Sequence, residues 1–391
     1  MSIMKKSCSL KNLVLSLILV ATVIPVSIAN CGVVNDGTPK DLFPIYENGK
    51  WGYMDKSGKT VIKCVYDNVN YFSDRLASVE LNGKWGFIDA DGNMVVKPQF
   101  DGVASFEDGM ILVWNNIWEN DDEMETALYG YVNNKGVVIR KPQFYNASDF
   151  HQGYAPVKVG DKWGFIDRNG DIAIEPQYEN VGFFSEGLAP VSIDGKTGYI
   201  DVSGRMIIEP QYENAGFFSE GLAMARVGGK CGYIDKTGAF VIEPKYADAQ
   251  PFENGMGDVN IGTWIRVKWR FIDKNGVFLF SPDFEVVGHF SEGLATVKIN
   301  GKWGFIDEKG VIVIEPQFKE VNPFCEGLAK LKVDGKFGFI DKSGNVVIEP
   351  QYDVAGGFYN GLAEVRIGDY DTGRYMYIDQ SGKVVRDWKL K

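Results

Sequence analysis

The sequence predicts an all-β protein, built as a tandem array of about ten three-stranded antiparallel units. An aromatic position recurs along the chain, and six of its nine intervals are 34 residues long, while the other three are 44, 38 and 38. The 46 glycines follow no collagen-like triplet and therefore indicate many tight turns. A period of this length is typical of stacked supersecondary units. The recurring position is occupied by Trp51, Trp85, Tyr129, Trp163, Thr197, Cys231, Trp269, Trp303, Phe337 and Tyr375.

One regular copy, residues 294–327, shows how each unit is built. A first strand ends at Asn300-Gly301, a dipeptide that favours a type I′ hairpin turn. The second strand, 303–306, alternates so that Trp303 and Phe305 share one face, and Gly304 permits close approach of a neighbouring backbone. Residues 307–310 form the next turn, and the third strand ends at a proline, which cannot donate to a ladder. We therefore expect a three-stranded meander followed by a linker with apolar side chains.

A single meander of three strands is marginal alone, so the units must bury their apolar faces against one another. Two architectures satisfy this requirement, an open β-superhelix and a closed, β-propeller-like ring. Propeller blades usually have four strands and number four to eight. Ten three-stranded units therefore favour the open array slightly, unless the linkers supply a fourth strand.

The unit resembles the bacterial WG-repeat family, also called KWG repeats. The motif Gly-Lys-Trp-Gly-Phe-Ile-Asp occurs at 83–89 and 301–307, a close variant occurs at 161–167, and Ile-Glu-Pro-Gln-Tyr/Phe follows in several copies. The resemblance extends over residues 42–386. It implies all-β tandem repeats, often in exported proteins, and carries over no catalytic residue. The motif departs from the family pattern mainly in the third, fifth, sixth, seventh, ninth and tenth units, where its Trp or Gly is replaced. At Thr197 and Cys231 the loss of aromatic bulk puts tight packing of those two units in doubt.

The amino terminus predicts export. Lysines at 5 and 6 precede a short apolar run over 13–24, and small residues follow at Ser27 and Ala29, as in a signal peptide. Cleavage after Ala29 would release a soluble protein. Alternatively Cys31 is a lipidation site, since residues 28–31 resemble a lipobox apart from Asn30. We assign residues 1–29 to a signal peptide, 30–41 to a tether and 42–391 to the repeat array, and expect a protein of the bacterial cell envelope, lipid-anchored or secreted.

The net charge of the chain excludes some classes of binding partner. The formal net charge is -11, and no basic patch with interleaved aromatic residues occurs. Such a chain repels phosphate backbones, so we expect no nucleic-acid partner and membrane contact only through a lipid anchor.

No arrangement of residues indicates catalysis, a metal or a cofactor. The two histidines, His151 and His289, lie at different positions of their repeats, and the five cysteines form no Cys-x-x-Cys motif. An aspartate recurs at the second turn of most units, but turn stabilisation accounts for the series better than calcium, because no downstream bidentate glutamate follows. We expect a protein that is not an enzyme.

Three insertions mark a candidate binding edge. All fall in the hairpin between the first and second predicted strands, in the third, seventh and tenth units, and insertions on one edge of a repeat array often mark its binding face. Drift at loop tips is the alternative explanation. The candidate residues are Trp114, Trp118, Asp121, Asp122, Trp264, Arg266 and Tyr370.

These features predict a non-catalytic extracytoplasmic scaffold for a protein or peptide partner. The alternative is a glycan or cell-wall binder that uses the repeated aromatic residues as platforms. Because the aromatic position also accepts Thr197 and Cys231, a packing role is favoured over a ligand cage.

Overall fold

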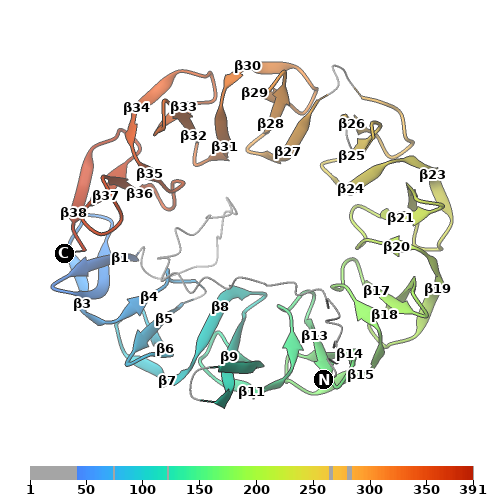
Figure 1. Ribbon diagram of the computed structural model, residues 1–391, viewed down its shortest axis with the longest axis horizontal. Coiled ribbons are helices and arrows are strands. Elements are labelled where there is room, and N and C mark those ends of the chain that lie inside the picture. The colour runs from blue at the N-terminus through green and yellow to red at the C-terminus, as the bar shows by residue number, and fades with distance from the viewer. Residues whose placement is uncertain (1–41, 74, 121–122, 264–266, 280–283, 391) are drawn as a thin grey trace, which may run out of the picture.

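The computed structural model describes residues 42–390, except residues 74, 121–122, 264–266 and 280–283, and it describes no side chains for residues 118–125. The described chain forms 38 strands and no helix, and the strands build a ring of ten small antiparallel sheets (Figure 1). The fold is therefore a ten-bladed β-propeller. Within these residues no helix has the length and hydropathy needed to cross a membrane.

We number the blades 1 to 10 in chain order. Blade 1 contains β1 Leu42–Glu47, β2 Lys50–Asp55 and β3 Thr60–Tyr66, and blade 2 contains β4 Asn68–Val69, β5 Leu76–Leu81, β6 Lys84–Asp89 and β7 Met94–Phe100. Blade 3 contains β8 Gly102–Glu107, β9 Met110–Asn120, β10 Glu123–Asn133 and β11 Val138–Phe144, and blade 4 contains β12 Asn146–Ala147, β13 Tyr154–Val159, β14 Lys162–Asp167 and β15 Ile172–Tyr178. Blade 5 contains β16 Asn180–Val181, β17 Leu188–Ile193, β18 Lys196–Asp201 and β19 Met206–Tyr212. Blade 6 contains β20 Asn214–Ala215, β21 Ala223–Val227, β22 Lys230–Ile234 and β23 Phe240–Tyr246, and blade 7 contains β24 Asp248–Glu253, β25 Met256–Asn260 and β26 Trp269–Ile272. Blade 8 contains β27 Val286–Ser291, β28 Leu294–Ile299, β29 Lys302–Asp307 and β30 Ile312–Phe318, and blade 9 contains β31 Glu320–Cys325, β32 Leu328–Val333, β33 Lys336–Asp341 and β34 Val346–Tyr352. Blade 10 contains β35 Val354–Ala355, β36 Leu362–Ile367, β37 Arg374–Asp379 and β38 Val384–Trp388.

Most blades have four strands, one more than the three that the sequence predicted. Eight of the ten described sheets have four strands, and only blades 1 and 7 have three. The extra strand is the predicted linker, which pairs with the strand that follows it and so joins the next sheet: β31 pairs with β32, with Glu320 opposite Lys332 and Val321 opposite Leu331. It lies on the inner side of the ring, and the last strand of each blade lies on the outer side (Figure 1). Each sequence repeat thus contributes to two neighbouring blades.

Apolar side chains on both faces of each sheet hold neighbouring blades together. In β29 the three central residues are all buried, because this strand lies between two other sheets. Phe305 faces the following blade, where the ring of Phe324 from β31 packs 4.8 Å away, centroid to centroid. Ile306 belongs instead to the cluster shared with the preceding blade, which contains Phe271. The core is therefore a circle of inter-blade clusters rather than one centre.

The ring is closed, so the open superhelix that the sequence slightly favoured is wrong. Strand β1 contacts β38, and Arg386 of β38 forms an ion pair with Glu47 and donates a hydrogen bond to the carbonyl of Gly58 (3.4 Å). A buried cluster that contains Phe43 of blade 1 and Trp388 of blade 10 lies at the same junction. The fourth strand explains the closure, since four-stranded sheets are the usual blades of a propeller.

Candidate binding face

The antiparallel order of each blade separates its turns onto two faces of the ring. The second and third strands of a four-stranded blade, such as β28 and β29, meet at the Asn-Gly type of turn, on the same face as the connections between blades. We call this the hairpin face. The other two turns of each blade lie on the opposite face, which we call the Asp-turn face because Asp307 and its equivalents lie there.

Side chains on the Asp-turn face are engaged in contacts between blades. The carboxylate of Glu186 accepts a hydrogen bond from the backbone N–H of Gly221 in the next blade (3.1 Å) and forms an ion pair with Lys236 (3.1 Å). The same pattern recurs 34 residues later, where Glu220 binds the N–H of Gly255 and pairs with Lys274. These repeated contacts serve packing and leave less of this face for a partner.

The repeated aspartate stabilises its own turn, as expected. One carboxylate oxygen of Asp307 accepts hydrogen bonds from the backbone N–H groups of Lys309 and Val311, both at 2.9 Å. In blade 9 hydrogen bonds from Asn345 are the first cause of a lowered pKa of the Asp341 carboxyl. Within the described residues no cluster of three or more His, Cys, Asp or Glu side chains has a geometry that could hold a metal ion.

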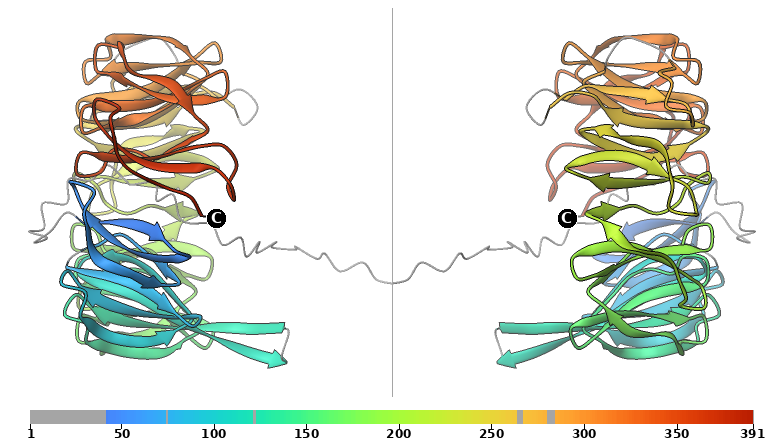
Figure 2. Two further views of the ribbon diagram at one scale, coloured as in Figure 1. Left: turned by 90° about the vertical axis from the view of Figure 1, so that its left-hand side faces the viewer. Right: turned by 90° about the vertical axis from the view of Figure 1, so that its right-hand side faces the viewer.

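All three insertions lie on the hairpin face. The largest extends β9 and β10 to 11 residues each, where the equivalent strands β5 and β6 have six. The resulting two-stranded ribbon projects beyond the body of the ring (Figure 2). At about 3.3 Å per residue, five additional residues lengthen a strand by roughly 16 Å. The other two insertions separate β25 from β26 and β36 from β37, at the equivalent turn.

Trp114, one of the predicted edge residues, anchors the base of this ribbon. It pairs with Gly102 of β8 on one side and with Tyr129 of β10 on the other. A Cβ atom on Gly102 would lie 2.0 Å from the indole ring, so the ring covers a position where only glycine fits. The Tyr129 ring is 6.1 Å away. The half-buried Trp114 thus has a packing role that the sequence did not predict.

Tyr370 is placed on the hairpin face with 41% of its surface exposed. The guanidinium of Arg366 lies 5.8 Å from the Tyr370 ring and 5.6 Å from that of Tyr375. The Tyr375 hydroxyl donates a hydrogen bond to the carbonyl of Tyr370 (2.9 Å). These contacts hold the inserted loop of blade 10 against its own sheet.

The remaining predicted site residues cannot be placed. Asp121, Asp122, Trp264, Arg266 and the proposed lipidation site Cys31 lie outside the described residues, and so does the predicted signal peptide. Trp118 lies in β9, but its side chain is not among those described.

The recurring aromatic position also lies toward the hairpin face, and in the blades without an insertion it is next to the hairpin turn. The Trp303 indole is half-buried, and the ammonium group of Lys298 lies 5.7 Å from its ring. The two residues that replace the aromatic ring are both buried, since Thr197 is 7% exposed and Cys231 is 0% exposed. The doubt about packing in these two units is therefore resolved in favour of tight packing.

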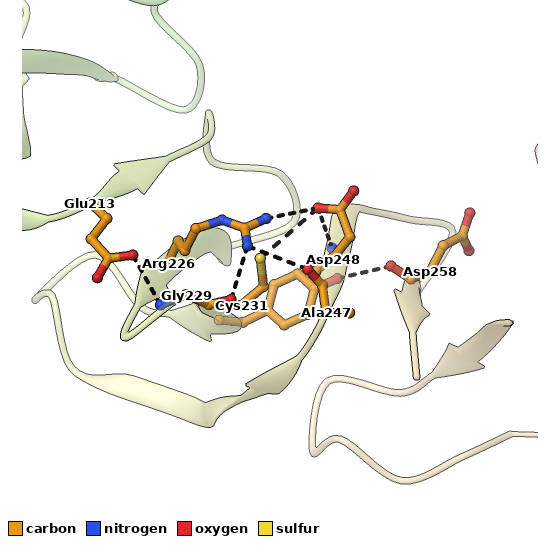
Figure 3. Close-up of polar contacts among 9 residues, drawn as sticks. Glu213, Arg226, Gly229, Cys231, Ala247, Asp248 and Asp258 are labelled. Atoms are coloured by element: carbon orange, nitrogen blue, oxygen red, sulfur yellow. Dashed lines mark hydrogen bonds and ion pairs between the residues drawn. The ribbon is translucent and has the colours of Figure 1, made fainter. Parts of the chain in front are cut away.

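Figure 3 shows how blade 6 fills this position without an aromatic ring. Arg226, opposite Cys231 on the neighbouring strand, donates to the carbonyl oxygens of Gly229 (3.1 Å) and Ala247 (3.4 Å) and forms an ion pair with Asp248 (3.3 Å). Burial raises the pKa of the Cys231 thiol. This cysteine is thus a small buried side chain.

The two histidines lie in different blades, and among the residues that the structure describes neither belongs to a group of side chains that could hold a metal ion. The His151 ring packs 4.1 Å from that of Phe183. His289 Nδ1 lies 2.9 Å from a carboxylate oxygen of Glu253 in the preceding blade. Next to this pair is Asp258, whose pKa is raised to about 7 by burial and then by Glu253, while His289 lowers it.

A set of acidic residues that the sequence analysis missed joins neighbouring blades on the hairpin face. Each lies in the connection between two blades, and its carboxylate accepts a hydrogen bond from the backbone of the following blade. Asp353 accepts from Gly368 N–H (2.8 Å) and pairs with Lys336 of the preceding blade (2.6 Å). The 17-residue spacing from this lysine to the acid was a signal in the sequence. Five of the six acidic connection residues accept from the hairpin turn, namely Asp67, Glu179, Glu213, Glu285 and Asp353, whereas Asp101 accepts from Asn116 within the lengthened strand β9.

The geometry defines a class of all-β repeat protein, a closed propeller in which each sequence repeat contributes to two neighbouring blades. The profile of the WG containing repeat family matches this chain nine times, at residues 51–85, 85–116, 129–163, 163–196, 198–231, 232–262, 269–303, 303–337 and 337–370. The chain therefore belongs to the WG-repeat family. Most matches run from one recurring aromatic position to the next and so cover the outer half of one blade and the inner half of the following blade.

Solved structures resemble the chain only distantly. Hsv2 of Kluyvelomyces marxianus is 9% identical with a TM-score of 0.36, over 72% of this chain and 95% of that one. The extracellular domain of BT4673 from B. thetaiotaomicron is 11% identical with a TM-score of 0.28, over 87% of this chain and 63% of that one. Both scores lie below 0.5, so neither likeness bears on what this chain binds. A comparison with curated proteins finds no match.

Proposed function

We propose that this protein is a non-catalytic, extracytoplasmic scaffold that binds a protein or peptide partner through the hairpin face of its ring. The β9–β10 ribbon carries this proposal, because it extends the chain away from the body of the ring at a place where most other blades have a two-residue turn (Figure 2). The signal-like sequence over residues 1–29 supports export, to the cell envelope through a lipidated Cys31 or into the medium.

Two further observations support the choice of face. The other two insertions lie on it as well, and one of them presents Tyr370 with 41% of its surface exposed. Aromatic residues are enriched where protein partners bind. On the opposite face, glutamate and lysine side chains such as Glu186 and Lys236 are engaged between blades.

The test removes the ribbon without disturbing the blade. Asn115 and Leu128 face each other across the ribbon, in the register where Leu81 and Lys84 close the hairpin of blade 2. Replacing residues 116–127 by Asn-Gly should therefore give an ordinary blade hairpin. Partners would be identified by cross-linking to the mature protein, and their affinity for both proteins then measured by calorimetry. We expect the shortened protein to keep its thermal midpoint and to lose at least tenfold in affinity.

The matched control replaces Glu308 and Lys309 by alanine, since both are exposed in a turn of the Asp-turn face. This variant should bind as the wild type does. A purified partner that bound the shortened protein with unchanged affinity would refute the role of the ribbon.

Glycan binding is the second candidate, favoured by one observation. Half-buried aromatic rings such as Trp85, Trp163 and Trp303 recur on the hairpin face, and aromatic rings of this kind can stack on sugars. A glycan array probed with the mature protein distinguishes the two candidates. Specific glycan signals that a Trp303→Ala substitution reduced would favour this alternative over a protein partner.

A further inference from the structure

The connection between blades 8 and 9 differs from the acidic connections in the sign of its charge. At the position where six connections carry Asp or Glu, this one carries Lys319. The residue that would pair with the acid is Lys302, which keeps the 17-residue spacing of the Lys84–Asp101 and Lys336–Asp353 pairs. Two lysines therefore occupy positions that elsewhere hold a lysine and a carboxylate.

The backbone around these lysines matches that of the acidic connections. Glu320 pairs with Lys332 here as Asn68 pairs with Glu80 between blades 1 and 2. The hairpin turn of blade 9 has φ angles of 46° at Asp334 and 83° at Gly335, and the equivalent turn of blade 5 has 49° and 69°. The N–H of Gly335 therefore has the position of the Gly195 N–H, which the Glu179 carboxylate accepts at 3.0 Å.

Among the described residues, no carboxylate completes this arrangement. Within the described residues, neither the Lys302 nor the Lys319 ammonium group makes an ion pair or a hydrogen bond, and both side chains are exposed. The same holds for the Gly335 N–H. Two exposed lysines and a backbone donor thus lie at positions whose equivalents in the acidic connections hold a lysine, a carboxylate and a turn N–H.

The other two connections without an acid differ from this one. Between blades 3 and 4, Tyr145 replaces the acid, but Leu128 stands where the lysine would be, so no cation is present. Between blades 6 and 7 the acid is replaced by Ala247, and there the side chain of Asn260 accepts the turn N–H groups of Gly262 and Lys268. Only the connection between blades 8 and 9 combines a missing carboxylate with two lysines.

We propose that Lys302, Lys319 and the Gly335 N–H bind the carboxylate of an acidic side chain, Asp or Glu, of a partner peptide. The internal ligand at the equivalent positions is such a side chain, so the spacing of the donors suits it. Hydrogen bonds between charged groups are about twice as strong as neutral ones. The net charge of -11 does not prevent this binding at physiological salt, where charges beyond about 8 Å are screened. The proposal rests on the proposed function, because it names the chemistry that the hairpin face recognises.

The test uses the mature protein and a fluorescein-labelled peptide of five glutamates, with binding measured by fluorescence anisotropy at physiological salt, where the net charge of the protein is screened. The main variant is Lys319→Asp, which supplies the internal carboxylate found in the acidic connections and should fold as they do. We expect it to lower the affinity at least tenfold, and Lys302→Gln to lower it about threefold to tenfold. The control is Lys309→Asp, which makes the same change of charge in an exposed turn on the opposite face and should leave the affinity unchanged.

Three results would overturn the proposal. The first is a wild type that does not bind the pentaglutamate more tightly than a pentaglutamine peptide. The second is equal loss of affinity in Lys319→Asp and Lys309→Asp, because that would reflect overall charge. The third is binding of polygalacturonate without binding of the peptide, which would assign the site to acidic glycans. The ribbon-shortened protein should bind pentaglutamate normally, so failure of the ribbon test and failure of this one are distinguishable.

Discussion

A Cβ atom on Gly304 would lie 2.4 Å from the carbonyl oxygen of Ile314 on the adjacent strand. The close approach arises where β30 makes a bulge: Trp303 pairs with Phe318 and Phe305 with Ile314, so four steps along β30 match two steps along β29. Pro316 lies within this bulge. The glycine after the aromatic position and the Glu-Pro-Gln segment of the repeat are therefore two halves of one structural feature.

Blade 10 lacks both the glycine and the bulge opposite it. Its glycine position holds Met376, and there Tyr375 pairs with Trp388, Met376 with Asp387 and Tyr377 with Arg386, without a bulge at these residues. The outer strand of this blade also lacks the Glu-Pro-Gln segment. A side chain is accommodated because the neighbouring backbone does not bend toward it.

We predict that Gly304→Ala destabilises the protein by roughly 1–3 kcal/mol, because backbone atoms of β30 must move away from the new methyl group. Circular dichroism during heating would measure the effect as a lower midpoint of unfolding. Gly216→Ala is the matched control, since a Cβ at Gly216 meets nothing within 4 Å. Equal midpoints for the two variants would contradict the explanation.

A second prediction concerns ring closure. Trp388 is 8% exposed in the cluster between blades 10 and 1, so Trp388→Ala should cost about 3 kcal/mol or more of unfolding free energy. Arg386→Ala should cost about 1 kcal/mol or less, because its ion pair with Glu47 is partly exposed. Small-angle scattering would report opening of the ring as a larger radius of gyration. An unchanged midpoint in Trp388→Ala would show that the closing cluster contributes little.

A third prediction concerns pH. The pKa of Asp258 is raised to about 7, above the unfolded value of about 3.9, so the folded protein binds a proton more tightly than the unfolded chain. The free energy of unfolding therefore falls as the pH rises from about 3.9 to about 7, because the folded protein must then bury a charged carboxylate. Asp258→Asn should match the wild type near pH 4 and exceed its thermal midpoint at pH 8.

The neighbours of Asp258 determine the control for this experiment. Glu253 raises the pKa of Asp258, whereas His289 lowers it, so the pH series should be repeated in a His289→Gln background. There the advantage of Asp258→Asn at pH 8 should persist. Its absence in both backgrounds would show that the carboxylate is not destabilising.

A fourth prediction concerns the aromatic position of blade 6. The Arg226 guanidinium contacts Gly229, Ala247 and Asp248 beside Cys231, which is 0% exposed, so Cys231→Trp should destabilise by roughly 1–3 kcal/mol (Figure 3). Adding Arg226→Lys should recover part of the loss, since blade 8 combines Lys298 with Trp303. Chemical unfolding of the four proteins in the cycle measures this coupling. Strictly additive effects would refute it.

Much of this architecture could be predicted from local sequence. The period, the hairpin turns at Asn300-Gly301 and its equivalents, and the turn role of Asp307 all depend on residues close together in the chain, and each prediction is confirmed. The close approach at Gly304 was also predictable, because glycine inside a strand indicates a neighbouring backbone. The common face of the three insertions followed from their equivalent positions.

Tertiary structure decided what local sequence could not. Whether the linker around Val321 is a loop or a strand depends on its pairing with Leu331. With this fourth strand in most blades, the array forms a closed ring and not the expected open superhelix. Trp114 looked like a binding residue, yet its ring covers Gly102, a contact that requires both strands in place. The connection carboxylates were missed for the same reason, because each accepts a backbone hydrogen bond from the following blade. Asp67, Asp101 and Asp353 also pair with a lysine of the preceding blade. The sequence determined the unit, whereas contacts between units, formed only when the ring closes, determined the number of strands in a blade and the two faces of the ring.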